Sequence, residues 1–237
     1  AVMSFSAPLM IMAQVLIYVL AVPLGILCAV NRANPIDRSV SLGLFLLYSI
    51  PPFVAGMLFL LFFCYGVFFD WFPALGLHSP GAESFGWARY LADYLWHAFL
   101  PVVCLSLFSL AAMAMYSRTA MLDVVGQDFI RTARAKGLSR GKVIFKHGLR
   151  NALIPIITLF AGFLPAMLGG SVLIEWLFGI PGMGRLSWDS IEQKDFPTLM
   201  ALVYIQAIVV MLSILLTDIL YVFVDPRISF ERQEQGG

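Results

Sequence analysis

Long apolar runs alternate with short charged segments along this chain. A helix needs about 20 apolar residues to cross roughly 30 Å of membrane hydrocarbon. Five stretches meet that length, at about residues 8–30, 40–65, 98–117, 152–175 and 199–223. The pattern predicts an all-α integral membrane protein, with residues 1–237 forming a single transmembrane domain that has five visible spans.

Prolines interrupt several of these runs, including the first, at Pro23. Pro51 and Pro52 lie midway through the second predicted span, and Pro155 and Pro165 lie in the fourth. A proline removes a helical hydrogen bond, and such breaks are tolerated where packing or a water-lined cavity satisfies the backbone. Close helix packing through small residues is the alternative explanation for each break. Together they favour a protein that bends or lines a path.

Charged residues make up 12% of the chain and are sorted by loop. Twelve of the fifteen Lys and Arg residues lie in three segments: 31–39, 118–150 and the tail after 223. The other two loops, 66–97 and 176–198, hold three. Because positive charge stays in the cytoplasm, we expect the first set and the C-terminus inside, and the N-terminus outside. An external start with five spans leads us to expect one further span upstream, six in all.

The segment 118–150 carries eight of the basic residues between two runs that lack Lys, Arg, Asp and Glu. We expect Asp123 to cap a helix that runs to about Lys136, and Gly137 to end it. Apolar residues at steps of three and four predict one apolar face, formed by Leu122, Val125, Phe129 and Ala133. A second face carries Gln127, Arg131 and Arg134.

A second short helix is predicted after this glycine, with Ser139 as its cap. Its basic residues recur every four positions, at Lys142, Lys146 and Arg150. A helix, a glycine turn and a helix make a rigid element that is suited to docking. A loop that is basic only because cytoplasmic loops are basic explains the charge but not this layout.

Ionisable groups are rare within the predicted spans. Asp218 lies inside the last span, and such a residue is a functional candidate by default. We expect it to pair with Arg118 or Arg150 near the cytoplasmic end of a neighbouring span. Glu175 ends the fourth predicted span, where it faces either a path or water.

No motif for covalent chemistry is present in the sequence. The glycine-rich stretch GIPGMGR follows no strand and lacks the Lys-Ser/Thr pair of a phosphate loop. The three His residues are scattered through loops, and the three Cys residues lack metal-ligand spacing. We expect no catalytic residue, no metal, no cofactor held by this chain and no nucleic-acid partner.

The stretch DFIRTARAKGLSRGKVIFKHGLRNALIP, residues 128–155, strongly resembles the coupling loop of permeases from the dipeptide/oligopeptide branch of ABC importers. The general permease motif is Glu-Ala-Ala, three residues and Gly; here Arg131, Thr132 and Ala133 precede Gly137, and the Glu is absent, as is usual for the peptide branch. The resemblance extends through NPIDRS, SIPPF, IEWLFGIPGMGRL and VDPRISF. It is closest to the first of two paired permease subunits, a type with an additional first span and a long outer loop.

This resemblance implies a type I ABC importer permease fold in a bacterial inner membrane, with several spans. It implies a second permease in a heterodimer, two cytoplasmic ATPases that bind ATP-Mg, and an external or periplasmic solute-binding protein. The residues implied in ATPase coupling are Phe129, Arg131, Thr132, Ala133, Arg134, Ala135 and Gly137. Candidates for lining or gating the path are Pro51, Pro52, Glu175, Gly182 and Gly184.

Peptides are the expected substrate, and this chain is not expected to hydrolyse ATP itself. A nickel complex or an oligosaccharide is the alternative within the same family. Two other classes are a channel or scaffold subunit without energy coupling, which needs no docking loop, and an ion-coupled carrier, which needs more charge within its spans.

Overall fold

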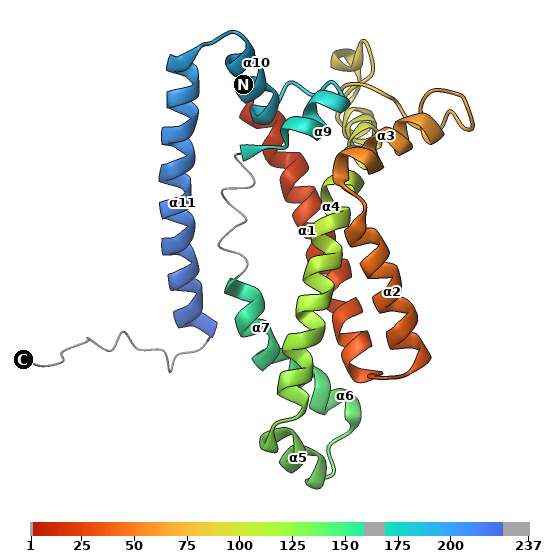
Figure 1. Ribbon diagram of the computed structural model, residues 1–237, viewed down its shortest axis with the longest axis vertical. Helices are drawn as coiled ribbons and strands as arrows, with labels where there is room; N and C mark the ends of the chain where they lie inside the picture. Colours follow the sequence, from red (N-terminus) through yellow and green to blue (C-terminus); the bar gives the residue numbers. More distant parts are fainter. Residues whose placement is uncertain (1, 159–168, 225–237) are drawn as a thin grey trace, which may run out of the picture.

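The computed structural model describes residues 2–158 and 169–224, and helices dominate these residues. The long helices run side by side, and short helices lie at both ends of the bundle (Figure 1). In chain order the helices are α1 (Met3–Val30), α2 (Pro35–Ser49), α3 (Pro52–Phe63), the 3-10 turn Ala82–Ser84, α4 (Trp87–Val125), α5 (Asp128–Ala135), α6 (Arg140–Lys142), the π-helical turn Val143–Gly148, α7 (Leu149–Thr158), α9 (Val172–Leu177), α10 (Met183–Glu192) and α11 (Phe196–Val224). We call the two ends of the bundle the α5 end and the α10 end.

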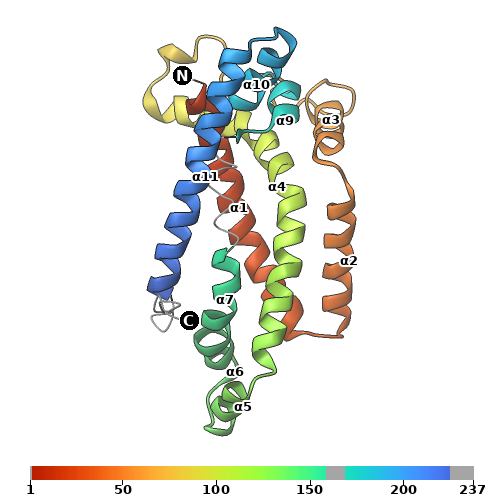
Figure 2. The ribbon, with the colours of Figure 1, turned by 60° about the vertical axis from the view of Figure 1, so that its left-hand side comes forward.

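Helices α1 and α4 form the centre of the bundle and pack along most of their length (Figure 2). Small residues allow this approach: Ala21 and Ala114 are fully buried, and Gly25 lies directly on the backbone of α4. A Cβ at Gly25 would lie 2.5 Å from the carbonyl oxygen of Ala114 and 2.8 Å from the nitrogen of Arg118. Close backbone contact between helices through small residues is typical of membrane bundles.

The second predicted span consists of two helices. Helices α2 and α3 meet at Ile50 and Pro51 and are bent by 93°. Ile50 is extended, as steric contact with a following proline requires, and Pro52 is the first residue of α3, where its missing N–H is not needed. The carbonyl of Leu47, which proline should have left unpaired, accepts a hydrogen bond from the N–H of Ile50.

Helix α4 begins at Trp87, eleven residues before the predicted start of the third span. Its 39 residues are about 58 Å long at 1.5 Å per residue, well beyond the hydrocarbon thickness. The expectation that residues 87–97 form a loop is therefore wrong. Arg89 and Asp93 lowered the hydropathy there, but each has a partner: Arg89 lies over the ring of Phe85, and Asp93 accepts hydrogen bonds from Ser79.

Three helices are long and apolar enough to cross a membrane, namely α1, α4 and α11, and the bent pair α2–α3 makes up to four. This comparison covers the described residues only. The predicted fourth span includes residues 159–168, and the basic tail lies after 224; both fall outside them.

Helix α11 stands apart from α1 and α4 (Figures 1 and 2) and packs within the chain mainly on α10 and α7. Its apolar side chains are almost all exposed. Asp195 precedes it, and its carboxylate accepts hydrogen bonds from the N–H of Thr198 (3.2 Å) and its hydroxyl (2.5 Å). These two bonds lower the pKa of Asp195 and cap the first turn of α11.

Candidate functional sites at the two ends of the bundle

Glu175 is the centre of a hydrogen-bonded cluster at the α10 end. Its side chain lies in α9, and the residue is 2% exposed. One carboxylate oxygen, Oε1, accepts from the hydroxyl of Ser6 at 2.7 Å and from the N–H of Ser171 at 3.3 Å. The other, Oε2, accepts from the N–H of Arg185 at 2.9 Å. The hydroxyl of Ser6 in turn accepts from the N–H of Met183 at 2.7 Å. We call these five residues the Glu175 cluster.

The cluster caps two helices at once. Ser171 immediately precedes α9, and Met183 and Arg185 lie in the first turn of α10. Helix N-termini leave N–H groups without helical partners and favour negative charge, so one carboxylate satisfies both. Glu175 therefore faces neither water nor an open path in this structure, and the sequence-based expectation for it is wrong.

Three glycines allow the cluster to form. A Cβ at Gly170 or Gly182 would collide with the Glu175 carboxylate, and one at Gly182 would also strike the Ser6 hydroxyl. A Cβ at Gly184 would lie 2.6 Å from the nitrogen of Val172. Gly182 and Gly184, predicted as gate residues, are thus required sterically by the approach of α10 to α9 and α1.

The segment 179–184 connects α9 to α10 and is held on several sides. Gly179 adopts a left-handed conformation with φ of 64°, and the N–H of Ile180 bonds to the carbonyl of Glu175 at 2.8 Å. Ile180 is fully buried. The carbonyl of Phe178 accepts from the N–H of Gly76, which ties this region to the segment after α3.

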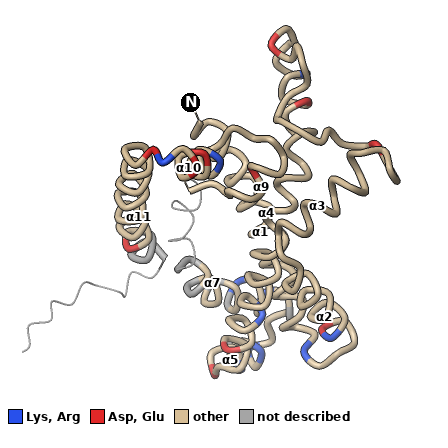
Figure 3. Tube along the Cα trace, turned by 45° about the horizontal axis from the view of Figure 1, so that its top comes forward, with Lys and Arg blue, Asp and Glu red and all other residues tan. Residues whose placement is uncertain are grey.

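The second site is the helical loop at the α5 end, where Lys and Arg gather around α5 and α7 (Figure 3). Its first helix differs from the prediction. Helix α4 continues to Val125, because Met121 and Val124 still pack in the core, and the break falls at Gly126. Asp123 therefore lies inside α4 and does not cap α5. The sequence predicted that Leu122, Val125 and Phe129 share one apolar helix face. This prediction is wrong, because the break at Gly126 puts Phe129 on a different helix from Leu122 and Val125.

Helix α5 has one buried and one exposed face. Ile130 and Ala133 are 1% and 7% exposed and pack against α4 and α1 residues such as Met121 and Ile26. Phe129 is 38% exposed. The other exposed residues on α5 are Asp128, Arg131, Thr132, Arg134 and Ala135. Ala133 therefore supports α5 from within and does not belong to its exposed surface.

Gly137 ends α5 as the sequence indicated. Its φ is 76°, in the left-handed region that glycine favours. The N–H of Gly137 bonds to the carbonyl of Arg134, and the N–H of Leu138 bonds to that of Ala133. This pair of bonds is the Schellman arrangement. Helix α6 begins directly after Ser139, and a π-helical turn then leads into α7. The predicted single helix with Lys142, Lys146 and Arg150 at every fourth position is therefore not a regular α-helix.

Arg118 and Asp218, a predicted pair, are not partners. The guanidinium of Arg118 binds both carboxylate oxygens of Asp37 at 2.8 Å, and Asp37 is 4% exposed. Asp37 also accepts from the N–H of Ala33 and the hydroxyl of Ser41. Asp218 is exposed on α11, with no ion-pair partner among the described side chains, to which that of Arg150 does not belong. Sequence analysis missed Asp37, although it lies in the quoted motif NPIDRS.

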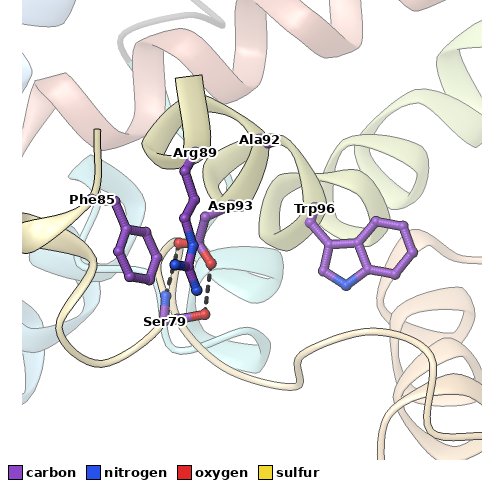
Figure 4. Close-up of a pocket in the computed structure, with 6 residues that line it drawn as sticks. All are labelled: Ser79, Phe85, Arg89, Ala92, Asp93 and Trp96. Atoms are coloured by element: carbon purple, nitrogen blue, oxygen red, sulfur yellow. Dashed lines mark hydrogen bonds between the residues drawn. The ribbon is translucent and has the colours of Figure 1, made fainter. Parts of the chain in front are cut away.

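An open pocket of about 390 Å³ lies beside the first turns of α4, lined by Ser79, Phe85, Arg89, Ala92, Asp93 and Trp96 (Figure 4). Asp93 accepts from the hydroxyl and N–H of Ser79 at 2.6 and 2.9 Å, and it contacts His78 at 3.2 Å. The ring of His78 stacks on Tyr90. These contacts hold the segment between α3 and α4 against α4, and among the described residues no group of His, Cys, Asp and Glu is placed to bind a metal.

The arrangement of helices defines a type I ABC importer permease. Two inward-facing structures of the MetNI methionine ABC transporter have the same fold; for one, the TM-score is 0.68 over 93% of each chain, at 17% sequence identity. The model of the family "Binding-protein-dependent transport system inner membrane component" matches residues 21–230. The chain belongs to this family.

Its relatives include AppB, an oligopeptide transport system permease protein of Bacillus subtilis, which is 39% identical over 94% of this chain. YejB of Agrobacterium fabrum, a peptidoglycan transport system permease protein, is 38% identical over 92% of the chain. OppB of Mycobacterium tuberculosis, an oligopeptide transport system permease protein, is 39% identical over 94%. The chain spans 68%, 60% and 69% of the length of these three proteins.

Proposed function

We propose that this permease subunit forms half of the translocation path of an ATP-driven importer for peptides. The path lies between it and a second, different permease. Two cytoplasmic ATPases bind ATP-Mg and hydrolyse it, and an external solute-binding protein delivers the peptide. The relatives support the substrate class, because those named above act on oligopeptides or peptidoglycan.

The observation that carries the coupling role is the split of α5 into two faces. Ile130 and Ala133 fix the helix to α4, while Phe129 and the arginines beside it remain exposed. Exposed aromatic and Arg side chains on one short helix are common anchors at protein interfaces. Among the alternatives, a channel or scaffold subunit without energy coupling has no use for such an element.

The α5 end is then cytoplasmic, together with the C-terminus, and the α10 end is external. The excess of Lys and Arg in 31–39 and 118–150 supports this orientation. We further propose that the segment 179–184 closes the external mouth of the path, and that the bend at Pro51 and Pro52 lets α3 lie across that mouth. A connector with no gating role is the alternative for 179–184.

Reconstitution of the complex in liposomes tests the function. Radiolabelled peptides of two to ten residues, a nickel complex and an oligosaccharide are supplied with the cognate binding protein and internal ATP. Peptide uptake that stops without ATP is the expected result. Uptake of only the nickel complex or the oligosaccharide would show that the substrate is that of another branch of the family. Uptake without ATPases would show that the subunit forms an uncoupled channel.

A further inference from the structure

We propose that Glu175 is a positioning residue for transport: it locks the segment 179–184 to α1, so that this segment and α1 move as one body. This inference rests on the proposed import function and assigns a role to a side chain that touches no substrate. Its basis is the Glu175 cluster, in which one buried carboxylate on α9 joins the start of α10 to α1, which is distant in sequence.

The cluster accepts a carboxylate and disfavours its amide. All three groups that face the carboxylate are donors: the hydroxyl of Ser6 and the N–H groups of Ser171 and Arg185. The amide nitrogen of a glutamine would face one of these donors in either orientation, which leaves a buried polar group unpaired. Among the described side chains no cation pairs with Glu175, and the guanidinium of Arg185 contacts Asp189 instead, at 3.9 Å.

Ser6 extends the lock to α1. It is 1% exposed and lies in the second turn of α1, where it donates to Glu175 and accepts from Met183 at the start of α10. Displacement of α10 from α1 must therefore break the bond from Met183 to this hydroxyl, and displacement of α9 from α1 must break the bond from the hydroxyl to Glu175. The glycines around the carboxylate let the backbone of α10 approach so closely that an added Cβ at Gly182 would strike both Ser6 and Glu175.

Helix α1 continues the connection toward the other end of the bundle. Gly25 lies on the backbone of α4 next to Arg118, and α4 leads directly into α5 through Gly126. The segment 179–184 is therefore linked to α5 by two packed helices and one carboxylate. Coupling between distant sites is carried by such physically continuous elements, and the carboxylate is a polar joint of this one at the α10 end.

The test compares Glu175→Gln with Glu192→Gln, which changes an exposed glutamate on α10 that accepts a hydrogen bond from the ring N–H of Trp188. Both are made in the full complex with a cysteine at Ile180, a fully buried position in the segment. An impermeant maleimide is applied from outside, and the complex without the new cysteine gives the background from the buried native cysteines. We expect labelling of Ile180→Cys to rise roughly tenfold or more in Glu175→Gln and to stay unchanged in Glu192→Gln.

Coupling gives the second measurement. The number of ATP molecules hydrolysed per imported peptide should rise severalfold in Glu175→Gln, while the peptide concentration for half-maximal uptake stays the same. A purely structural role would lower the yield of complex and leave this ratio and the protection of Ile180→Cys as in the wild type, which would overturn the proposal.

Ser6→Ala repeats the test without removing the charge. It should raise labelling and the ATP-to-peptide ratio in the same direction, and the double variant with Glu175→Gln should be no worse than Glu175→Gln alone, because both break one cluster. Ser187→Ala, which removes a hydroxyl hydrogen bond within α10, is the matched control.

Failure of both cluster variants to assemble would show that Glu175 is needed for folding and would also overturn the proposal. If the wild-type complex imports no peptide, the function fails, but the labelling contrast still decides the lock.

Discussion

Arg118 on α4 donates two hydrogen bonds of 2.8 Å to the two carboxylate oxygens of Asp37, at the start of α2. The pair lies seven residues before the end of α4 and so fixes α2 to the base of the helix that carries α5. Asp37 is nearly inaccessible and holds two further hydrogen bonds, whereas Arg118 keeps some contact with the surface. The pair therefore joins the first half of the bent pair α2–α3 to the α5 end of the molecule.

Asp37→Asn should lower the free energy of unfolding by about 3 kcal/mol, because it leaves a poorly hydrated guanidinium without its counter-charge. The measurement is the thermal unfolding of the purified complex in detergent. Asp189→Asn removes the exposed partner of Arg185 and should cost less than about 1 kcal/mol. Equal effects of the two substitutions would show that the Asp37–Arg118 pair adds no more than a surface contact.

Orientation can be read from two exposed positions. A cysteine at Gln193, just after α10, should react with an impermeant thiol reagent in intact cells, and one at Lys142, in α6, should react only after the membrane is opened. The reason is the unequal distribution of Lys and Arg between the two ends. Labelling of Lys142→Cys in intact cells would reverse the proposed topology.

Gly137→Val should leave the protein in the membrane and abolish substrate-stimulated ATP hydrolysis. No atom lies within 4 Å of a Cβ built at Gly137, so the cost comes from the left-handed backbone alone, roughly 1–2 kcal/mol. Relief of that strain rotates α6 relative to α5. Gly137→Asn, which tolerates this conformation better, should retain most of the stimulation, and Gly141→Val, at an open helical position with ordinary φ, should change it little. Normal stimulation in Gly137→Val would reduce the loop to a connector.

Phe129 and Ile130 are neighbours on α5 with opposite roles. Phe129→Ala should reduce the amount of ATPase that co-purifies with the permease, with little effect on unfolding, since its side chain is exposed. Ile130→Ala should cost about 2–4 kcal/mol of stability, because it empties a site that is 1% exposed. Unchanged ATPase binding in Phe129→Ala would remove this side chain from the interface.

The sequence by itself determined the class of the protein and much of one site. Apolar runs of membrane length require helices that satisfy their own backbone, so the all-α fold follows from composition alone. Gly137 was identified correctly because a helix end with a left-handed residue is a local property of a few neighbouring positions. The family was evident because the loop and the C-terminal third carry their pattern in consecutive residues.

Only the tertiary structure decided which charges meet and where the helices end. Arg118 was one of two basic partners expected for Asp218, and packing of α2 on α4 instead gave it Asp37, which is 81 residues away in sequence. Helix α4 begins early and ends late because partners in other segments satisfy Asp93 and cover Met121. By sequence Glu175 was a candidate for the path, but in the structure α1 and α10 enclose it. Its carboxylate accepts hydrogen bonds from Ser6, 169 residues earlier, and from the backbone at the starts of two helices. Spacing along a chain cannot encode such contacts, since long-range packing, not local periodicity, sets which buried groups find partners.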